Sequence, residues 1–238
     1  MQLPALVHAT LVRRDNRFRA TVELGDAWGS AHVPTSGRLS ELLVPGADIW
    51  LAPIDRPGRK TPYDLLLVQH GDTLVSIDAR LPNALFAEHL LKTGWLGNPV
   101  GQIEREVTLG KSRLDLRIRD ERSTTWIEIK SVTLVEKGIA LFPDAPTVRG
   151  TRHVRELTHA VQQGDEAAVI FVAQRNDPRS YSPHHRADPD FAAALHAARR
   201  AGVAILAYAC AVNLDRVVIA RELPVGLHHD ENLVGPDE

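Results

Sequence analysis

Hydrophobic residues alternate with polar ones along the first third of the chain, and this pattern predicts short β-strands. The runs that carry it, between Ala5 and Ile77, are ALVHATLV, RFRATVEL, WGSAHV, DIWLAPI, YDLLLVQ and TLVSI. One segment differs: SGRLSELL opens at Ser36 and has leucines at helical spacing, so a short helix is expected there. Several strands interrupted by one helix favour a small closed barrel of the OB type, with five strands in Greek-key order.

The pattern changes after about residue 80. NALFAEHLLK, residues 83–92, is predicted to be a helix, and the glycines, asparagine and proline that follow indicate a junction. EREVTL, RLDLRIRD and WIEIKSVTL then predict three strands. Helices are expected over residues 149–163 and over FAAALHAARRAG, each before an apolar strand (AAVIFVA and VAILAYACAV), and RVVIARELP supplies a last strand. Antiparallel strands followed by alternating helices and strands predict an α/β domain with a mixed sheet.

These patterns divide the chain into four parts. We expect an OB-like barrel over residues 1–80, a helix and junction over 81–100, an α/β domain over 101–226 and a tail over 227–238. The acidic, polar tail is typical of a disordered segment. A length of 238 residues fits one large domain or two modest ones, and the change of pattern favours two.

The candidate chemistry lies on two successive predicted strands. In RLDLRIRD the apolar residues alternate with charged ones, so Asp115 projects from the polar face of its strand. In WIEIKSVT, Ile127 and Ile129 are expected to face a core, while Trp126, Glu128 and Lys130 share the other side of a half-buried strand. If the two strands pair through the ERSTT turn, Asp115, Glu128 and Lys130 converge, with Glu106 from the preceding strand as a fourth candidate.

Clustered carboxylates repel one another unless a cation joins them, and Asp115, Glu128 and Glu106 would suit Mg²⁺ or Mn²⁺, which prefer oxygen ligands. Such a site typically completes its coordination with waters and a substrate phosphate, so the matching reaction is phosphodiester hydrolysis. Lys130 would orient the attacking water or stabilise the developing charge. The alternative interpretation of Glu128 and Lys130 alone is a solvated surface pair of little energetic value.

Composition limits the other classes of function. The formal net charge of -2 denies the chain a global attraction to nucleic acid, so a polyanion site must be a local basic patch. Cys210 is the single cysteine, which excludes an intramolecular disulfide and a multi-cysteine zinc site; neither zinc nor an organic cofactor is expected. Without a secretory signal or a membrane span in the pattern, a cytoplasmic protein that does not enter membranes is predicted.

The segment from RLDLRI to WIEIKSVTL resembles the signature of the PD-(D/E)xK nuclease superfamily, whose motif aspartate lies one strand before the ExK pair. Over almost the whole chain, the sequence is similar to the sugar fermentation stimulation protein A family, through RLSELLVPG, KTPYDLLLV, IDARLPNALFAEHL, SRLDL, IEIKSVTL, FPDAPTVRGTRHVREL and AVIFVAQR. This resemblance implies an OB-like domain followed by a restriction-endonuclease-like α/β domain. One departure is Thr35-Ser36-Gly37, where the family often has an Asn-Thr-Gly turn.

The resemblance also implies a function. Members are described as DNA-binding proteins without marked sequence preference, linked to regulation of sugar metabolism, particularly that of maltose. Asp115, Glu128 and Lys130 would form the nuclease-like core, with Glu106 at the position of the additional acid. Three hypotheses stay open. The first is a metal-dependent nuclease acting on single- or double-stranded DNA, and the second is a non-catalytic DNA-binding regulator that retains the nuclease fold. The third, an RNA-directed or repair nuclease, differs from the first only in its substrate. Many nucleases with this core are dimers, so a homodimer is open as well.

Basic residues in three regions are candidates for contact with DNA phosphates. Those in the predicted barrel are Arg13, Arg17, Arg19 and Lys60; one on the Asp115 strand is Arg113; those on the helix after the ExK strand are Arg149 and His153. Arg149 lies near the start of that helix, where free backbone N–H groups also favour anions. For His153, an interpretation as a histidine at the edge of the core is equally open.

Overall fold

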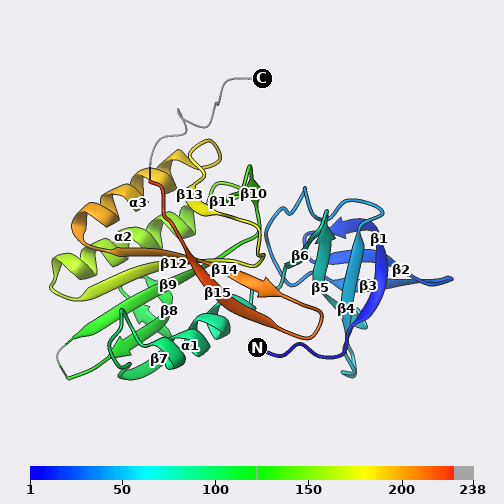
Figure 1. Ribbon diagram of the computed structural model, residues 1–238, viewed down its shortest axis with the longest axis horizontal. Coiled ribbons are helices and arrows are strands. Elements are labelled where there is room, and N and C mark those ends of the chain that lie inside the picture. The colour runs from blue at the N-terminus through cyan, green and yellow to red at the C-terminus, as the bar shows by residue number, and fades with distance from the viewer. Residues whose placement is uncertain (122, 228–238) are drawn as a thin grey trace.

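The computed structural model describes residues 1–121 and 123–227, and it shows a two-domain α/β protein. An N-terminal β-barrel lies beside a larger domain in which helices cover a mixed sheet (Figure 1). The predicted fold class, an OB-like barrel followed by a restriction-endonuclease-like domain, is therefore confirmed.

The barrel is built from the alternating segments of the first third of the chain. Its strands are β1 (Val7–Asn16), β2 (Arg19–Leu24), β3 (Ala27–His32), β4 (Asp48–Pro53), β5 (Tyr63–His70) and β6 (Thr73–Ser76). They follow the order β3-β2-β1-β4-β5-β6, and β3 also pairs with β5, which closes the sheet on itself. Alternation places Leu11, Val22 and Leu51 fully inside, because successive side chains of a strand point to opposite faces.

The short helix predicted at Ser36 is wrong. The segment forms turns, and Leu39 adopts a left-handed φ of 50° that ends any helical run there. The leucines at helical spacing are buried in the barrel nonetheless. The spacing of these leucines therefore correctly indicated that they are buried, but it did not indicate a helix.

The larger domain contains the remaining elements. They are α1 (Leu81–Thr93), β7 (Gln102–Leu109), β8 (Ser112–Arg119), β9 (Thr124–Val132), β10 (Val135–Glu136), β11 (Ile139–Phe142), α2 (Val148–Gln162), β12 (Glu166–Ala173), β13 (Ser180–Pro183), α3 (Pro189–Ala201), β14 (Ala204–Val212) and β15 (Val217–Leu223). The main sheet has the order β15-β14-β12-β9-β8-β7. β9, β12 and β14 are parallel, whereas β7, β8 and β15 pair antiparallel, so the sheet is mixed.

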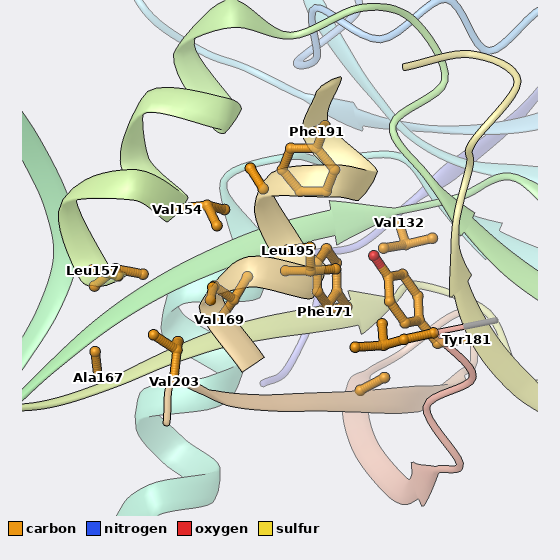
Figure 2. Close-up of a cluster of buried hydrophobic side chains, with 14 of the residues drawn as sticks. Val132, Val154, Leu157, Ala167, Val169, Phe171, Tyr181, Phe191, Leu195 and Val203 are labelled. Carbon is orange, nitrogen blue, oxygen red and sulfur yellow. The ribbon is translucent and has the colours of Figure 1, made fainter. Parts of the chain in front are cut away.

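Helices α2 and α3 cover one face of this sheet and α1 packs on the other. Both α2 and α3 connect parallel neighbours in the direction β9 to β12 to β14, and right-handed crossovers in one direction place their helices on the same face. Figure 2 shows the core beneath them, where Val154 of α2 and Phe191 of α3 lie over Phe171 of β12. Phe171 also stacks on Tyr181, with ring centroids 4.0 Å apart.

Strand β9 is not half-buried as predicted, because both of its faces are covered. Ile127 and Ile129 pack in the core beneath α1, as expected, while Trp126 packs in the core beneath α2. Glu128 shares the Trp126 face and is only 4% exposed. A carboxylate that the sequence placed on an accessible face is therefore largely removed from water.

A second, smaller sheet of β10, β11 and β13 was not predicted. Strands β10 and β11 lie between β9 and α2 in the chain, whereas β13 follows β12. Residues 228–238, nearly all of the tail for which disorder was predicted, lie outside the described residues, whereas Leu227 is buried in the core. Across residues 1–121 and 123–227, no helix is both long and apolar enough to cross a membrane.

The two domains are joined by hydrogen bonds as well as by the chain. Ser76, at the end of β6, donates its backbone N–H to the carbonyl of Gln174 and its hydroxyl to the Gln174 side chain, both at 2.9 Å. The Gln174 amide in turn donates to Ser131 Oγ at 2.9 Å. Both Ser76 and Gln174 are fully buried. Because unmade buried hydrogen bonds are costly, this contact fixes the barrel against the β9 and β12 ends.

Candidate active site

A cleft of about 690 Å³ lies between the two domains and contains the three predicted core residues. One side, here called the sheet wall, presents Asp115 from β8 and Glu128 and Lys130 from β9. The opposite side, here called the loop wall, is residues 35–39 of the barrel. The grouping of Asp115, Glu128 and Lys130 that strand alternation predicted is thus present in the structure.

Asp115 lies where the ladder between β8 and β9 ends. The last pair on this side is Leu116 with Ile127, and beyond it Asp115 Oδ2 accepts the backbone N–H of Ile129 at 2.7 Å. Its other oxygen accepts the side-chain amide of Asn83, from the first turn of α1, at 2.7 Å. The carboxylate takes the place of a strand carbonyl and is held at both oxygens.

Burial raises the pKa of Asp115 to about 6, and the nearby charge of Glu128 adds to the rise. A second negative charge close by disfavours ionisation, and a cation between the two carboxylates would remove that penalty. The electrostatics of the pair therefore favour cation binding near neutral pH.

Glu128 is the most enclosed of the three residues. Lys130 Nζ donates to its Oε1, and Nδ1 of His153 lies 2.6 Å from the same oxygen. Burial acts to raise the pKa of Glu128, but Lys130 and His153 outweigh it and hold the pKa below the usual value. The second oxygen, Oε2, is buried and has no hydrogen-bond partner. An ionised oxygen without a partner is what a cation ligand requires.

Glu106 is not brought into this group. The ladder pairs Arg105 with Leu116 and Val107 with Leu114, so Glu106 falls at the level of Asp115. Its φ of 56° departs from strand geometry, however, and its half-exposed carboxylate pairs with Arg113 Nε at 2.9 Å. Within the described residues, no three acidic, histidine or cysteine side chains are arranged to hold a metal ion. A cation site here would rest on two carboxylates.

Of the predicted DNA contacts, two line the cleft. Arg17, from the β1–β2 turn, and Arg149, from the first turn of α2, both do so. Arg13 and Arg19 instead flank Asp15 on the outer hairpin, at 2.8 Å and 3.6 Å. Lys60 and Arg113 also fall outside the residues that line the cleft, and His153 is 1% exposed, behind Glu128. The cleft therefore gathers only part of the predicted basic set.

Three residues of the site were missed from the sequence: Asn83, Arg38 and Asp144. The sequence placed Arg14 among the basic residues of the first hairpin, as a candidate for contact with the DNA backbone, and did not indicate its structural role. Arg14 donates to the carbonyls of Arg17 at 2.7 Å, Gly37 at 2.9 Å and Arg38. The backbone N–H of Arg38 donates to Asp144 Oδ2 at 2.7 Å, which ties the loop wall to the second domain. Apart from the contact between Arg14 and Arg17, which spans three positions, these contacts join segments more than twenty positions apart, so no spacing signal connects them. The polarity of Asn83, in the first turn of α1 and directly before the apolar residues 84–87, was the one usable hint.

The fold and the cleft together define a class: proteins in which an OB barrel precedes a restriction-endonuclease-like domain. Two family models match the chain, "SfsA N-terminal OB domain" over residues 12–77 and "Sugar fermentation stimulation protein RE domain" over residues 80–216. The chain belongs to the sugar fermentation stimulation protein family.

Relatives with known names support this membership. The "Sugar fermentation stimulation protein homolog" of Alkaliphilus metalliredigens is 46% identical over 222 residues, covering 92% of this chain and 96% of that protein. The homolog of Desulforamulus reducens is 44% identical over 227 residues, covering 94% of each. Among solved structures, Pyrococcus furiosus SfsA in complex with Ca²⁺ matches with a TM-score of 0.84 and 31% identity, over 95% of this chain and 98% of that one.

Proposed function

We propose that this chain binds DNA without marked sequence preference and hydrolyses its phosphodiester bonds with a divalent cation held in the cleft between its domains. The observation that carries the proposal is Glu128 Oε2, a buried carboxylate oxygen without a hydrogen-bond partner, beside a second carboxylate whose pKa is raised to about 6. The Ca²⁺ complex of the Pyrococcus furiosus relative supports the same interpretation.

The donor set fits a hard cation. Asp115 and Glu128 supply carboxylate oxygens, and Mg²⁺ characteristically uses one or two carboxylates together with waters and substrate phosphate. When bound, the cation supplies Lewis-acid polarisation of the phosphoryl group and an activated water. Mg²⁺ or Mn²⁺ is the proposed cofactor.

The residues of this chain then have separate tasks. Asn83 and the Ile129 N–H hold the Asp115 carboxylate in one orientation. Lys130 donates one of its three N–H groups to Glu128. The other two are available to orient the attacking water or to stabilise negative charge on the phosphoryl oxygens. Glu106 forms an ion pair with Arg113 outside the cluster, so we assign it no part in this arrangement.

Arg17, Arg38 and Arg149 line the cleft around this cluster and are the proposed phosphate contacts. Basic side chains that bind phosphates release counterions from DNA, so affinity falls as salt rises. The logarithm of the binding constant changes with the logarithm of the salt concentration with a slope of roughly -0.9 per phosphate contacted on duplex DNA and roughly -0.7 on single strands. Three contacts of this kind predict a slope of about -2 to -3. A sequence-specific complex that persists at high salt would contradict this part of the proposal.

The test is cleavage of labelled single- and double-stranded DNA in Mg²⁺ or Mn²⁺ by wild type and by Glu128→Gln, which keeps the shape but removes the charge. Glu166→Gln is the matched control, since Glu166 accepts from Thr125 at 2.8 Å on the same sheet and lies outside the cleft. We expect cleavage by wild type and by the control, and none by Glu128→Gln.

A non-catalytic DNA-binding regulator is the second candidate. It is favoured by one observation: both oxygens of Asp115 and Oε1 of Glu128 already have protein donors, so the cluster is largely balanced without a cation. Binding without cleavage, equal in wild type and Glu128→Gln, would select this function.

A further inference from the structure

The second donor to the Glu128 carboxylate, after Lys130, comes from helix α2. Thr147 caps this helix by accepting the N–H of Gly150 at 3.1 Å, and its own N–H donates to Asp188 Oδ2 at 2.7 Å. These bonds fix the first turns of α2 over β9. One turn apart on the helix, Arg149 and His153 then form a chain of contacts that ends on Glu128.

The tautomer of His153 follows from its two neighbours. Arg149 Nε lies 3.3 Å from Nε2 of the imidazole, and an arginine offers only donors, so Nε2 must be the acceptor. The imidazole proton is therefore on Nδ1, 2.6 Å from Glu128 Oε1, and Nδ1 donates to that oxygen. His153 is 1% exposed, so water does not compete for either nitrogen.

This arrangement determines which oxygen of Glu128 remains available. Oε1 receives two donors, from His153 and Lys130, while Oε2 receives none. A carboxylate bound at one oxygen by an imidazole of fixed tautomer cannot rotate freely, so Oε2 keeps one orientation. Metal ligands are commonly oriented in this way by hydrogen bonds from residues that do not touch the metal.

We propose that Arg149 and His153 are a positioning pair: Arg149 fixes the tautomer of His153, and His153 holds Glu128 so that Oε2 is presented to the cation. This inference rests on the proposed cation site. Arg149 is exposed at the cleft beyond its Nε contact, so the group that meets substrate phosphate is also the group that orients the catalytic carboxylate. Substrate binding and cation binding are thereby connected through two side chains.

The test compares His153→Asn, whose side-chain amide can place a donor near the Nδ1 position, with His153→Leu, which has similar bulk and no donor. His159→Leu, an exposed histidine on the same helix, is the matched control. Calorimetric titration with Ca²⁺ or Mn²⁺ should show about 10- to 100-fold weaker binding for His153→Leu. His153→Asn and His159→Leu should stay within about threefold of the wild-type affinity, below the loss expected for His153→Leu.

A second readout needs no cation. Long-range ¹H–¹⁵N spectra of the cation-free protein should show the Nδ1–H tautomer of His153, and Arg149→Met should allow the Nε2–H tautomer to appear. Folding of each variant is checked by its urea denaturation curve.

Each result decides the proposal. It is overturned if His153→Leu is folded and binds cations as wild type does, if His153→Asn loses as much affinity as His153→Leu, or if wild type shows the Nε2–H tautomer. A wild-type protein that binds cations but cleaves no DNA removes the hydrolytic function and leaves the positioning pair standing. If wild type binds neither cation, the proposed function and the positioning role both fail, whatever the tautomer.

Discussion

The two walls of the cleft are built in opposite ways. The sheet wall gathers two carboxylates and a lysine on neighbouring strands, and its charges are balanced by side chains buried under α1 and α2. The loop wall has backbone carbonyls that converge on one guanidinium, that of Arg14, and a single backbone N–H bound to Asp144. The sheet wall therefore keeps two buried carboxylates close together, at a cost that its hydrogen bonds only partly offset, while the loop wall is held by neutral backbone groups.

Because its carboxylates are buried, the sheet wall should lose stability when one of its charged partners is removed. Lys130→Met removes the cation paired with Glu128, and loss of one partner of a buried pair costs about 3 to 5 kcal/mol. Since Lys130 is at the edge of an open cleft, we expect the lower end, about 3 kcal/mol, in urea denaturation at pH 7. Adding Glu128→Gln should restore most of the loss. A double variant as unstable as Lys130→Met would show that packing, rather than charge, is responsible.

An effect of similar size is expected from a change of pH. The pKa of Asp115 is raised to about 6 from an ordinary value of 3.8, so the folded state resists its ionisation. Stability from this group is complete below about pH 4 and is lost as pH rises through about 6, a change of roughly 3 kcal/mol. Asp115→Asn, which does not ionise, should gain about that much relative to wild type between pH 4 and pH 8, measured in chelator. A pH-independent difference would contradict the raised pKa of Asp115, which burial causes first and the charge of Glu128 second.

Glu128 contributes with the opposite sign, because its pKa is lowered and its stabilisation is lost as pH falls below the ordinary range. The two acids are therefore separable by the pH range in which each variant departs from wild type. Ca²⁺ should raise the stability of wild type at pH 8 and leave Asp115→Asn nearly unchanged, since ligands stabilise only the state that binds them.

The smallest effect belongs to the loop wall. Arg14→Met removes donors from three carbonyls, but these lie near solvent and water can replace part of the loss, so we expect about 1 to 2 kcal/mol. Hydrogen exchange should accelerate at the amides of residues 36–39 and stay unchanged at Ile129. Arg14→Lys should not restore protection, because an ammonium lacks the planar fork that reaches several carbonyls. Arg186→Met, 78% exposed, is the control, and faster exchange at Ile129 would show that the walls are not independent.

Features that depend on the alternation of side chains along a strand could be predicted from the sequence. Alternation fixed the faces of Asp115 and Glu128, and the turn between β8 and β9 fixed their pairing, so their grouping could be predicted. Their roles stay predictions. The OB barrel followed likewise from regular alternation between Ala5 and Ile77.

Features that depend on packing between segments distant in the chain could not be predicted from the sequence. The Ser36 segment has helical leucine spacing, yet the Arg14 guanidinium binds the carbonyls that a helix would need, and Leu39 turns left-handed. His153 has helical spacing to Arg149, and the sequence left open whether it contacts DNA or lies at the edge of the core; it is buried, because α2 begins over β9 and encloses it. Strands β10, β11 and β13 are two to four residues long, too short for a periodic signal.

The buried contact between Ser76 and Gln174 has a consequence for how such proteins can be recombined. A barrel borrowed from a distant relative would meet a glutamine carbonyl and side chain that expect an N–H and a hydroxyl from the incoming strand end. Any residue except proline supplies the N–H, but without a hydroxyl at this position the buried side-chain oxygen of Gln174 would have no donor. The barrel therefore cannot be exchanged by itself. A stable chimera has to keep a matched pair of residues at these two positions, one in each domain.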